Sequence, residues 1–265
     1  MPVRLPPLPA ETAYWQRAED RQRVVNGLFD VAATHYDRAC TLMSFGSGQR
    51  YRREALVRAG LRNGMKVLDV GTGTGLLARE IGRVTGAPHR TVGLDPSSSM
   101  LAVCRKAATS VLVQGIAERL PIADESFDFV TMGYALRHVA DLDGAFSEYR
   151  RVLKPAGRIL LLEITRPRSM LGLAAARLYF RTLVPLATRI ATGSAEAAQL
   201  MRFYWDTIQM CVPPELVVAS LERVGFVGAR HTITFGIFSE YTGVRDSGPQ
   251  MSAEPEPIRD GRRTP

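Results

Sequence analysis

The sequence predicts an α/β protein in which a parallel β-sheet is covered by helices on both faces. Short runs of β-branched and apolar residues alternate along the chain with amphipathic helical patterns. A glycine-rich loop joins the first of these runs directly to a helix. Because parallel strands need a crossover connection, usually a helix, the alternation indicates parallel pairing.

Five β-type runs come first, at residues 66–70, 90–95, 110–115, 127–132 and 158–164. The C-terminal segment ARHTITFGIFSEYTGVR holds two more β-rich stretches, split near Gly236, which predict a closing hairpin or one bent strand. Four helices have readable limits: LLAREIGRVT, SSSMLAVCRKAAT with serines able to cap its start, DLDGAFSEYRRVLKPAGR ending at Pro155 and Gly157, and PPELVVASLERVGF.

The chain is predicted to form one folded domain, from Arg21 to Arg245. Residues 1–20 are an extension rich in proline and charge, expected to adapt to the surface beneath them. Residues 246–265 have almost no apolar side chains to bury and are predicted to be disordered. After the fifth strand, residues 165–212 are dense in Leu, Ala and Arg and predict a helical lid.

Composition excludes several classes of protein. An apolar content of 46% excludes a disordered or fibrous chain, and the net charge of +8 favours anionic partners. Three widely spaced cysteines, Cys40, Cys104 and Cys211, suit neither a disulfide framework nor a zinc site, so we expect no metal and a reduced, cytoplasmic location. The longest apolar stretches, such as 170–176, fall far short of the roughly 20 residues of a spanning helix. Recognised nucleic-acid motifs are missing from the sequence, so nucleic acid is not an expected partner.

The sharpest local signal is VLDVGTGTGLLARE, where a predicted strand runs into Gly71, Gly73 and Gly75. Glycines there allow a tight turn and a close approach of the backbone to a ligand. The spacing G-x-G-x-G differs from the dinucleotide pattern G-x-G-x-x-G, which needs glycine where this chain has Leu76. Pyrophosphate binding is therefore disfavoured.

Asp95 ends the next predicted strand, about 20 residues beyond the loop, where a carboxylate can accept hydrogen bonds from both ribose hydroxyls. Taken singly, the glycines also suit a structural turn, and Asp95 also suits a cap of the following helix. Together, at this spacing, they predict a nucleoside site.

Six segments resemble, in order, the ubiquinone/menaquinone C-methyltransferase family of the class I S-adenosylmethionine-dependent methyltransferases. They are HYDRACTLMSFGSGQRYRREAL, VLDVGTGTG, GLDPSSSML, AERLPIADESFDFVTMGYALRHV, YRRVLKPAGRILLLEITRP and GFVGARHTITFGIFSEYTGVR. The glycine loop and the Asp95 segment specify only the superfamily, whereas the YD…LMSFG, ALR and RVLKPAGRILLLEITRP segments point to this family. The resemblance covers about residues 29–245.

The resemblance implies a Rossmann-like, seven-stranded, mostly parallel sheet with the last strand antiparallel, an N-terminal helix and the inserted lid. It also implies S-adenosyl-L-methionine as cofactor, contacted by Thr74, Asp95, Gly133 and the backbone around Ile116 and Ala117. Ile116 stands where relatives usually carry Asp or Asn. With the loop and the helix that follows Asp95, the candidate cofactor-binding residues are Asp69, Gly71, Gly73, Thr74, Gly75, Asp95, Pro96, Met100, Ile116, Ala117 and Gly133.

The activity implied by the resemblance is C-methylation of a quinol or phenolic ring in quinone biosynthesis. An alternative is O- or N-methylation of a small metabolite or a phospholipid headgroup, because this fold changes its acceptor through the lid. A second alternative is a non-catalytic scaffold that binds the cofactor. The substrate can carry a lipid tail. The sequence is compatible with either a monomer or a homo-oligomer.

Methyl transfer gains mainly from alignment of the reactants, and a ring carbon becomes nucleophilic once a neighbouring hydroxyl loses its proton. Candidate groups lie just past the fourth strand, in GYALRHV. Arg137 matches the arginine of the family's G-L-R-N segment, which can stabilise a phenolate; the alternative is a helix-surface ion pair with Asp141. His138 replaces the family's asparagine and can accept a proton near neutral pH; the alternative is a packed or solvent-facing ring.

Aromatic residues are the candidate substrate-binding groups: Tyr36, Tyr134, Phe180 and Tyr204. His35 and Tyr36 either close over the cofactor with the N-terminal helix or simply pack against the sheet. The N-terminal segment departs from the family at Cys40, Thr41, Tyr51 and Arg52, which leaves the ring and the acceptor atom open.

The lid is rich in arginine, with Arg166, Arg168, Arg177, Arg181, Arg189 and Arg202 set among leucines. It is either an amphipathic helix lying on an acidic membrane surface or a cap with solvated arginines. Both interpretations place the substrate beneath it, and the first one adds peripheral contact with a membrane.

Overall fold

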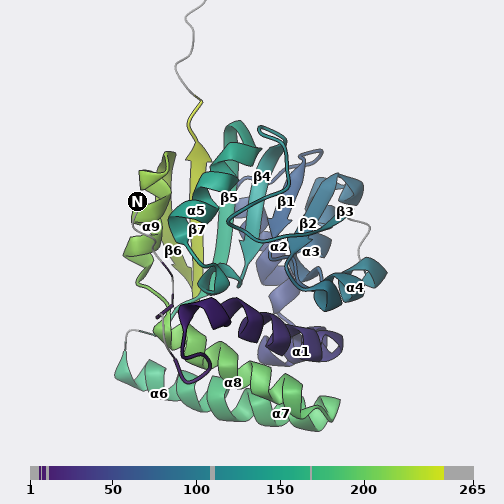
Figure 1. Ribbon diagram of the computed structural model, residues 1–265, viewed down its shortest axis with the longest axis vertical. Helices are drawn as coiled ribbons and strands as arrows, with labels where there is room; N and C mark the ends of the chain where they lie inside the picture. The colour runs from purple at the N-terminus through teal and green to yellow at the C-terminus, as the bar shows by residue number, and fades with distance from the viewer. Residues whose placement is uncertain (1–5, 7, 10–11, 108–110, 168, 248–265) are drawn as a thin grey trace, which may run out of the picture.

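The computed structural model describes residues 6, 8–9, 12–107, 111–167 and 169–247. Its centre is a seven-stranded sheet in the order β3-β2-β1-β4-β5-β7-β6 (Figure 1). The strands are β1 (Val67–Val70), β2 (Thr91–Asp95), β3 (Val111–Gln114), β4 (Phe127–Gly133), β5 (Leu153–Ile164), β6 (Phe226–Thr234) and β7 (Phe238–Arg245). Neighbours from β3 to β5 pair in parallel, and β7 is antiparallel to both β5 and β6. The expected sheet is confirmed.

The strand order reverses between β1 and β4. Connections from these two strands leave the sheet in opposite directions, which opens a crevice outside their carboxyl ends. The glycine loop follows β1, and the GYALRHV segment follows β4, so both predicted chemical segments lie at this crevice.

Helices cover both faces of the sheet (Figure 1). The α-helices are α1 (Arg21–Met43), α2 (Gly48–Arg58), α3 (Leu76–Thr85), α4 (Ser98–Ala107), α5 (Leu142–Val152), α6 (Met170–Leu178), α7 (Val184–Thr192), α8 (Ala195–Met210) and α9 (Pro214–Arg223). Short turns are η1 (Ala18–Asp20), η2 (Pro88–Arg90), η3 (Leu136–His138) and the π-helical η4 (Tyr179–Leu183). Alternate residues of β4 separate two cores: Phe129 packs with α2 and α3, and Val130 with α5 and α9.

One predicted boundary is wrong: α5 ends at Val152, before Pro155, and β5 begins at Leu153. Leu153 is extended, with φ −73° and ψ 142°, and pairs with Phe127 of β4. Proline removes a helical donor and keeps the residue before it out of the helical region, so the chain leaves the helix early and joins the sheet.

Two described residues of the N-terminal extension pack against the helices at the lower end of the molecule. Leu8 and Trp15 are buried in a cluster with side chains of α1, α7 and α8. Figure 1 shows α1 lying between the sheet and the helices α6, α7 and α8. The C-terminal tail, apart from residues 246 and 247, lies outside the described residues, as does Arg168.

The lid forms one helix from Met170 to Thr192, followed by α8. By length and composition alone this helix could cross a membrane, because its best 18-residue window has a mean hydropathy of 1.2 and at most two charged residues. The prediction that no stretch approaches spanning length is therefore wrong, since widely spaced arginines interrupt the apolar run without ending the helix. One face is buried inside the protein, through Phe180, Val184, Pro185 and Thr188.

Candidate functional site

The glycine loop after β1 adopts a conformation that requires glycine. Gly71, Gly73 and Gly75 have φ of 67°, 55° and 83°, in the left-handed region. A Cβ atom on Gly71 would also lie 2.7 Å from the Cβ of Ala135, so this position has no room for a side chain. The loop therefore brings bare backbone to the crevice between β1 and β4.

Asp69 holds the base of this loop from inside the sheet. Its carboxylate accepts hydrogen bonds from the hydroxyls of Thr72 and Thr131, each at 2.7 Å. Burial raises the pKa of Asp69 to about 6. The side chain is fully buried and does not line the pocket, so the structure gives Asp69 a supporting position behind the loop.

Asp95 ends β2 and faces the loop. One carboxylate oxygen accepts a hydrogen bond from the backbone N–H of Gly73 at 2.8 Å, and the other accepts one from Ser97 at 2.9 Å. The Ser97 hydroxyl in turn accepts from the N–H of Met100 at 3.0 Å, so Ser97 provides the side-chain cap of α4. Burial raises the pKa of Asp95 to about 6. Asp95 thus joins the loop to the start of α4 and still lines the pocket.

A pocket of about 750 Å³ lies outside the carboxyl ends of β1, β2 and β4 and beneath α1. The predicted residues that line it are Gly71, Gly73, Asp95, Pro96, Met100, Ile116, Ala117, Gly133, Tyr36, Tyr134, His138 and Tyr204. The predicted residues outside its lining are Asp69, Thr74, Gly75, Arg137 and Phe180.

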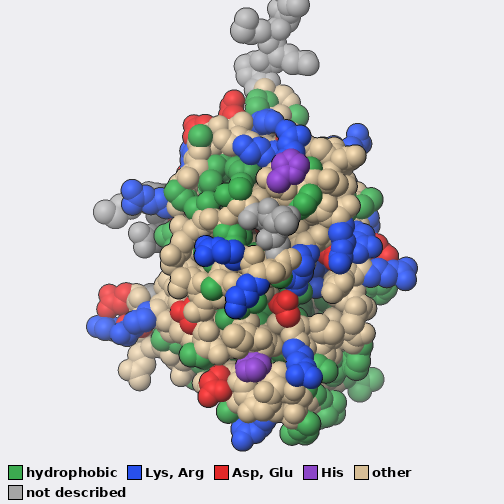
Figure 2. All heavy atoms as spheres, turned by 90° about the vertical axis from the view of Figure 1, so that its right-hand side faces the viewer, with side chains coloured by type: hydrophobic (Ala, Val, Ile, Leu, Met, Phe, Trp, Pro, Cys, Tyr) green, Lys and Arg blue, Asp and Glu red, His purple; other side chains and the backbone are tan. Residues whose placement is uncertain are grey.

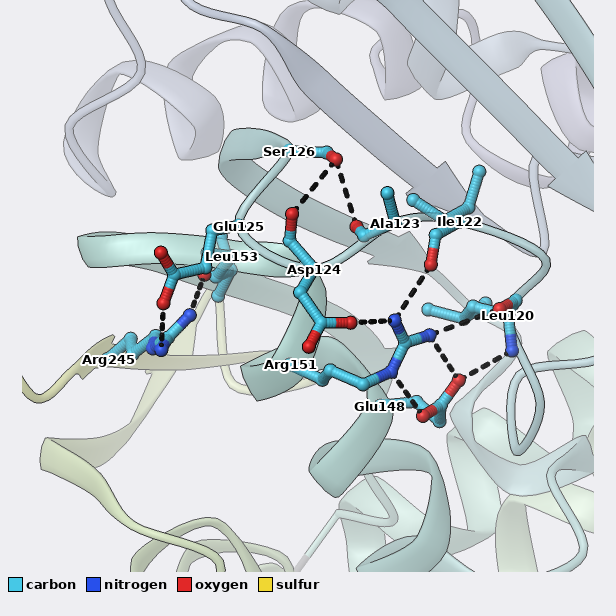
Figure 3. Close-up of polar contacts among 10 residues, drawn as sticks. All are labelled: Leu120, Ile122, Ala123, Asp124, Glu125, Ser126, Glu148, Arg151, Leu153 and Arg245. Carbon is cyan, nitrogen blue, oxygen red and sulfur yellow. Dashed lines mark hydrogen bonds and ion pairs between the residues drawn. The ribbon is translucent and has the colours of Figure 1, made fainter.

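Figure 3 shows how α5 holds the loop that follows Ile116 and Ala117, at residues 120–126. Arg151 of α5 donates to the carbonyl oxygens of Leu120 and Ile122, and it forms an ion pair with Glu148 at 2.7 Å. Glu148 also accepts from the N–H of Leu120 at 2.7 Å. The segment that continues from the pocket wall is therefore anchored to α5 at Leu120 and Ile122.

Helix α1 is latched over the pocket by polar contacts. Asp37 forms an ion pair with Arg79 at 2.8 Å and accepts a hydrogen bond from the Thr74 hydroxyl. Asp30 accepts a hydrogen bond from the Ser97 hydroxyl at 2.5 Å. Thr74 therefore contacts α1 rather than the pocket, and the N-terminal helix covers the site as the sequence led us to expect.

Sequence analysis missed the pocket residues contributed by the early part of α1: Gln22, Val25, Asn26 and Phe29. It also missed Ser97, Glu118, Ala135 and Val139. The α1 residues stand on one helical face, at spacings of three and four, which is the signal that could have identified them.

Arg137 is completely buried, which overturns the alternative of a helix-surface ion pair with Asp141. Its guanidinium pairs with Glu163 at 2.5 Å, donates to the carbonyl oxygen of Tyr134 at 2.9 Å and lies 4.3 Å from the ring centre of Tyr204. Among the described residues, Nη2 of Arg137 and Oε2 of Glu163 have no hydrogen-bond partner. Glu163 was not predicted, although a carboxylate ending an apolar strand was the available signal.

His138 lies in a cage of aromatic rings at the pocket wall. Its ring stacks on Phe203 at 5.5 Å and meets Phe29 edge-on at 5.4 Å. Burial lowers the pKa of His138 well below its ordinary value, and the nearby Arg137 lowers it further. The imidazole is therefore neutral at pH 7, and its ring nitrogens have no partner within the described chain.

Tyr36, Tyr134 and Tyr204 form an aromatic wall in the pocket that Asp95 also lines. The hydroxyls of Tyr36 and Tyr204 are 2.5 Å apart, and burial raises the pKa of Tyr204 to about 12. Tyr134 has a positive φ of 62°, a strained conformation for a non-glycine residue, and the Arg137 contact holds its carbonyl. Phe180 lies further into the lid, where it stacks on Trp205 at 5.7 Å.

The sheet order, the glycine loop with its acidic partner and the covered pocket define a class I S-adenosylmethionine-dependent methyltransferase. Residues 16–245 match the model of the ubiE/COQ5 methyltransferase family, and the chain belongs to this family. A ubiquinone/menaquinone biosynthesis C-methyltransferase from Saccharophagus degradans is 33% identical over 235 residues, covering 86% of this chain and 93% of that protein. One from Pseudomonas paraeruginosa is 34% identical, covering 87% and 93%.

Among solved structures, a SAM-dependent methyltransferase from Thermotoga maritima superposes with a TM-score of 0.58 at 20% identity. The superposition covers 83% of this chain and 99% of that chain, which supports the fold. Over the described residues, no group of three His, Cys, Asp or Glu side chains is placed to hold a metal ion.

Proposed function

We propose that this chain methylates a ring carbon of a quinol or a related phenol in quinone biosynthesis. The observation that carries the proposal is an aromatic wall of Tyr36, Tyr134 and Tyr204 beside the ribose-binding carboxylate, within one pocket. Flat apolar walls with a few polar groups suit an aromatic ring. The curated relatives, named as ubiquinone/menaquinone C-methyltransferases, support the same acceptor.

The pocket residues fit S-adenosyl-L-methionine. The Asp95 carboxylate suits the ribose hydroxyls, the bare backbone of Gly71 and Gly73 allows close approach, and the loop at Ile116 and Ala117 offers backbone and apolar surface for adenine. Ile116 has no hydrogen-bonding side chain, so adenine is held by packing and backbone groups. The cofactor supplies an electrophilic methyl group on its sulfonium.

The protein's own contribution is alignment and exclusion of water. Helix α1 closes the pocket, and the aromatic wall fixes the plane of the acceptor ring against it. Arg137, behind the pocket wall, holds Tyr134 through a hydrogen bond to its carbonyl oxygen and Tyr204 through a cation–π contact with its ring. His138 is neutral, so it suits hydrogen bonding more than proton storage.

Labelled cofactor and a panel of quinols, phenols and amines test this function, with mass spectrometry locating the label. We expect the label on a ring carbon of a quinol. Label on an oxygen or a nitrogen would instead support the O- or N-methyltransferase alternative. Cofactor binding without turnover of any acceptor would support the scaffold alternative.

We further propose that the lid rests on an anionic membrane surface on the cytoplasmic side and admits a lipid-tailed substrate. Large apolar side chains are exposed along the outer face of the lid helix: Met170, Leu171, Leu178, Leu183, Leu186 and Ile190. Figure 2 shows hydrophobic side chains gathered at the lower end of the molecule, where α6–α8 lie in Figure 1. Exposed Arg177 and Arg189 on the same helix complement acidic headgroups.

A packed apolar cluster connects the lid to the pocket wall. Tyr134 of the pocket wall packs in a cluster with Phe180, Trp205 and Tyr179 of the lid region. Phe45, which is 85% exposed, stacks on Tyr179 at 5.7 Å. Apolar contacts therefore continue from the aromatic wall to the exposed face of the lid, which supports entry of an apolar tail from that side.

Vesicle sedimentation tests the membrane contact. We expect binding to vesicles with phosphatidylglycerol and not to pure phosphatidylcholine, and less binding as salt rises. Replacing Leu171 and Ile190 together by Glu should abolish it, whereas Phe235→Glu, at a residue 79% exposed in the β6–β7 turn, should not. Equal and negligible binding to both vesicle types would leave only the cap interpretation.

A further inference from the structure

Arg52 is a buried cation without an acidic partner, close to the aromatic wall. Its side chain extends from the second turn of α2 and is only 8% exposed. Its guanidinium carbon lies 5.2 Å from the ring centre of Tyr134. This cation–π contact is with Tyr134. Within the described chain, no hydrogen bond or ion pair joins Arg52 to a carboxylate.

The groups around Arg52 do not supply the missing negative charge. Tyr36, Cys40, Tyr134 and Tyr204 are its electrostatic neighbours. Burial raises the pKa of the Cys40 thiol to about 11 and that of Tyr204 to about 12, and it raises those of Tyr36 and Tyr134 as well. All four groups are therefore neutral at pH 7.

Other charged groups near the site have different direct partners. Arg137 is paired with Glu163, and Asp37 is paired with Arg79. The Asp69 carboxylate is an electrostatic neighbour of Arg52, but it accepts its hydrogen bonds from the hydroxyls of Thr72 and Thr131. Arg52 is thus a buried guanidinium that contacts no carboxylate among the described residues, a costly arrangement that a bound anion would relieve.

We propose that Arg52 binds an anionic oxygen carried by the aromatic acceptor, and so selects acceptors that are charged at the ring. This inference rests on the proposed function, because it assumes an aromatic acceptor at the tyrosine wall. The anionic oxygen has two chemical sources: a ring hydroxyl that ionises in the pocket, or a carboxylate fixed to the ring. A planar guanidinium is suited to either.

Arg52 acts on the acceptor and not on the cofactor. It stands on α2 against Tyr134, whereas Asp95 and the glycine loop lie at the ends of β2 and β1. Its Nη1 lies near Ser44 and Gly48, since a Cβ atom on Gly48 would be 2.9 Å from it.

Ligand binding tests the proposal without turnover, in the presence of saturating S-adenosylhomocysteine. The first probe is para-nitrophenol, whose ionised form absorbs visible light. We expect the wild-type protein to lower the pKa of bound para-nitrophenol by about one unit, which is a tenfold preference for the anion. Arg52→Gln should abolish this shift. Arg50→Gln is the matched control, because Arg50 lies on the same helix but is exposed and paired with Glu54.

The second probe pair identifies the source of the anion. A preference of about tenfold or more for gentisate over gentisamide, lost in Arg52→Gln, would assign a ring carboxylate. A shift with para-nitrophenol and no preference for gentisate would assign an ionised ring hydroxyl. Arg52→Lys keeps the charge, so it should keep part of either preference and tests the idea even if the Gln variant folds poorly.

Two results would overturn the proposal. In one, Arg52→Gln binds para-nitrophenolate and gentisate as tightly as the wild type. In the other, it loses the neutral gentisamide by the same factor as the anions, which is the behaviour of a purely structural residue. A charge preference that depends on Arg52, together with no methylation of any quinol, would instead reject the proposed function and leave this inference standing.

Discussion

The proposed ribose contact requires a charged Asp95, yet burial of the carboxyl group favours its protonated form. Burial raises its pKa from 3.8 to about 6, against the two backbone N–H groups that favour the carboxylate. The folded protein then binds this proton more tightly than the unfolded chain does. Protonation of Asp95 therefore stabilises the empty fold, and that contribution is lost as pH rises from about 4 to about 6.

Cofactor affinity should increase with pH, whereas the stability contribution of the protonated Asp95 decreases with pH. Affinity for S-adenosylhomocysteine should fall as the pH drops below about 6, because the protonated carboxyl accepts ribose hydrogen bonds less well. At pH 7.5, Asp95→Ala should weaken binding by about 1.5 to 3 kcal/mol, the range for a hydrogen bond to a charged group. Calorimetry measures both effects, and unchanged affinity in Asp95→Ala would remove the ribose assignment.

Arg137 and His138 are neighbours with different expected roles. The pKa of His138 lies well below its ordinary value, so no limb near pH 6 to 7 in the turnover rate is expected from it, and His138→Asn should cost less than about tenfold. Arg137→Lys should lower kcat by about 10²-fold, since a point charge cannot hold Glu163, Tyr134 and Tyr204 together.

Steady-state kinetics and cofactor calorimetry separate these two roles. A merely destabilising change at Arg137 would weaken cofactor binding along with turnover, whereas a role in aligning the acceptor leaves cofactor affinity intact. Nearly full turnover in Arg137→Ala, or a pH limb that disappears in His138→Asn, would reverse the assignment.

Among the elements, α1 covers the pocket. It is the N-terminal helix, yet it contacts α3 through Asp37 and Arg79, and the start of α4 through Asp30 and Ser97. Both contacts join α1 to the segments that carry the proposed cofactor residues. If the cofactor binds there, we expect its entry and release to require movement of α1.

Weakening this latch should speed cofactor release. Asp37→Asn removes the charge that pairs with Arg79 and should raise the dissociation rate of S-adenosylhomocysteine about tenfold, as a loss of about 1.4 kcal/mol would. Asp20→Asn is the control, because Asp20 pairs with Arg17 and Arg23 at the start of α1. Stopped-flow displacement measures both, and equal rates in all three proteins would contradict a gating role.

At the scale of the whole molecule, α1, α7, α8 and the N-terminal residues Leu8 and Trp15 form a third apolar cluster. Trp15 is buried, and it packs edge-on against Phe203 at 6.4 Å in the cluster that α1, α7 and α8 share. This cluster sits next to the cage of His138, because Phe203 belongs to both. Stability of the lid region is thus coupled to the shape of the pocket.

Trp15→Ala should lower the free energy of unfolding by about 3 to 5 kcal/mol, the cost of a large buried aromatic side chain. Phe235→Ala, at an exposed residue, should change it by no more than about 0.5 kcal/mol. Denaturant unfolding followed by circular dichroism compares them. A small change in the free energy of unfolding for Trp15→Ala would show that Trp15 is dispensable for the cluster that it shares with α1, α7 and α8.

The order of strands and helices could be predicted from the sequence, because hydrophobic periodicity and glycine turns are local signals. Helix α3 and the glycine loop lie where their residues predicted, as does Asp95. The charge states and the interaction partners of the side chains in the site could be found only in the folded protein. They depend on burial among segments far apart in the chain. Examples are the pairing of Arg137 with Glu163, the neutral state of His138, and the buried guanidinium of Arg52 against the Tyr134 ring. Desolvation and pairing are set by the packed environment, which no local pattern encodes.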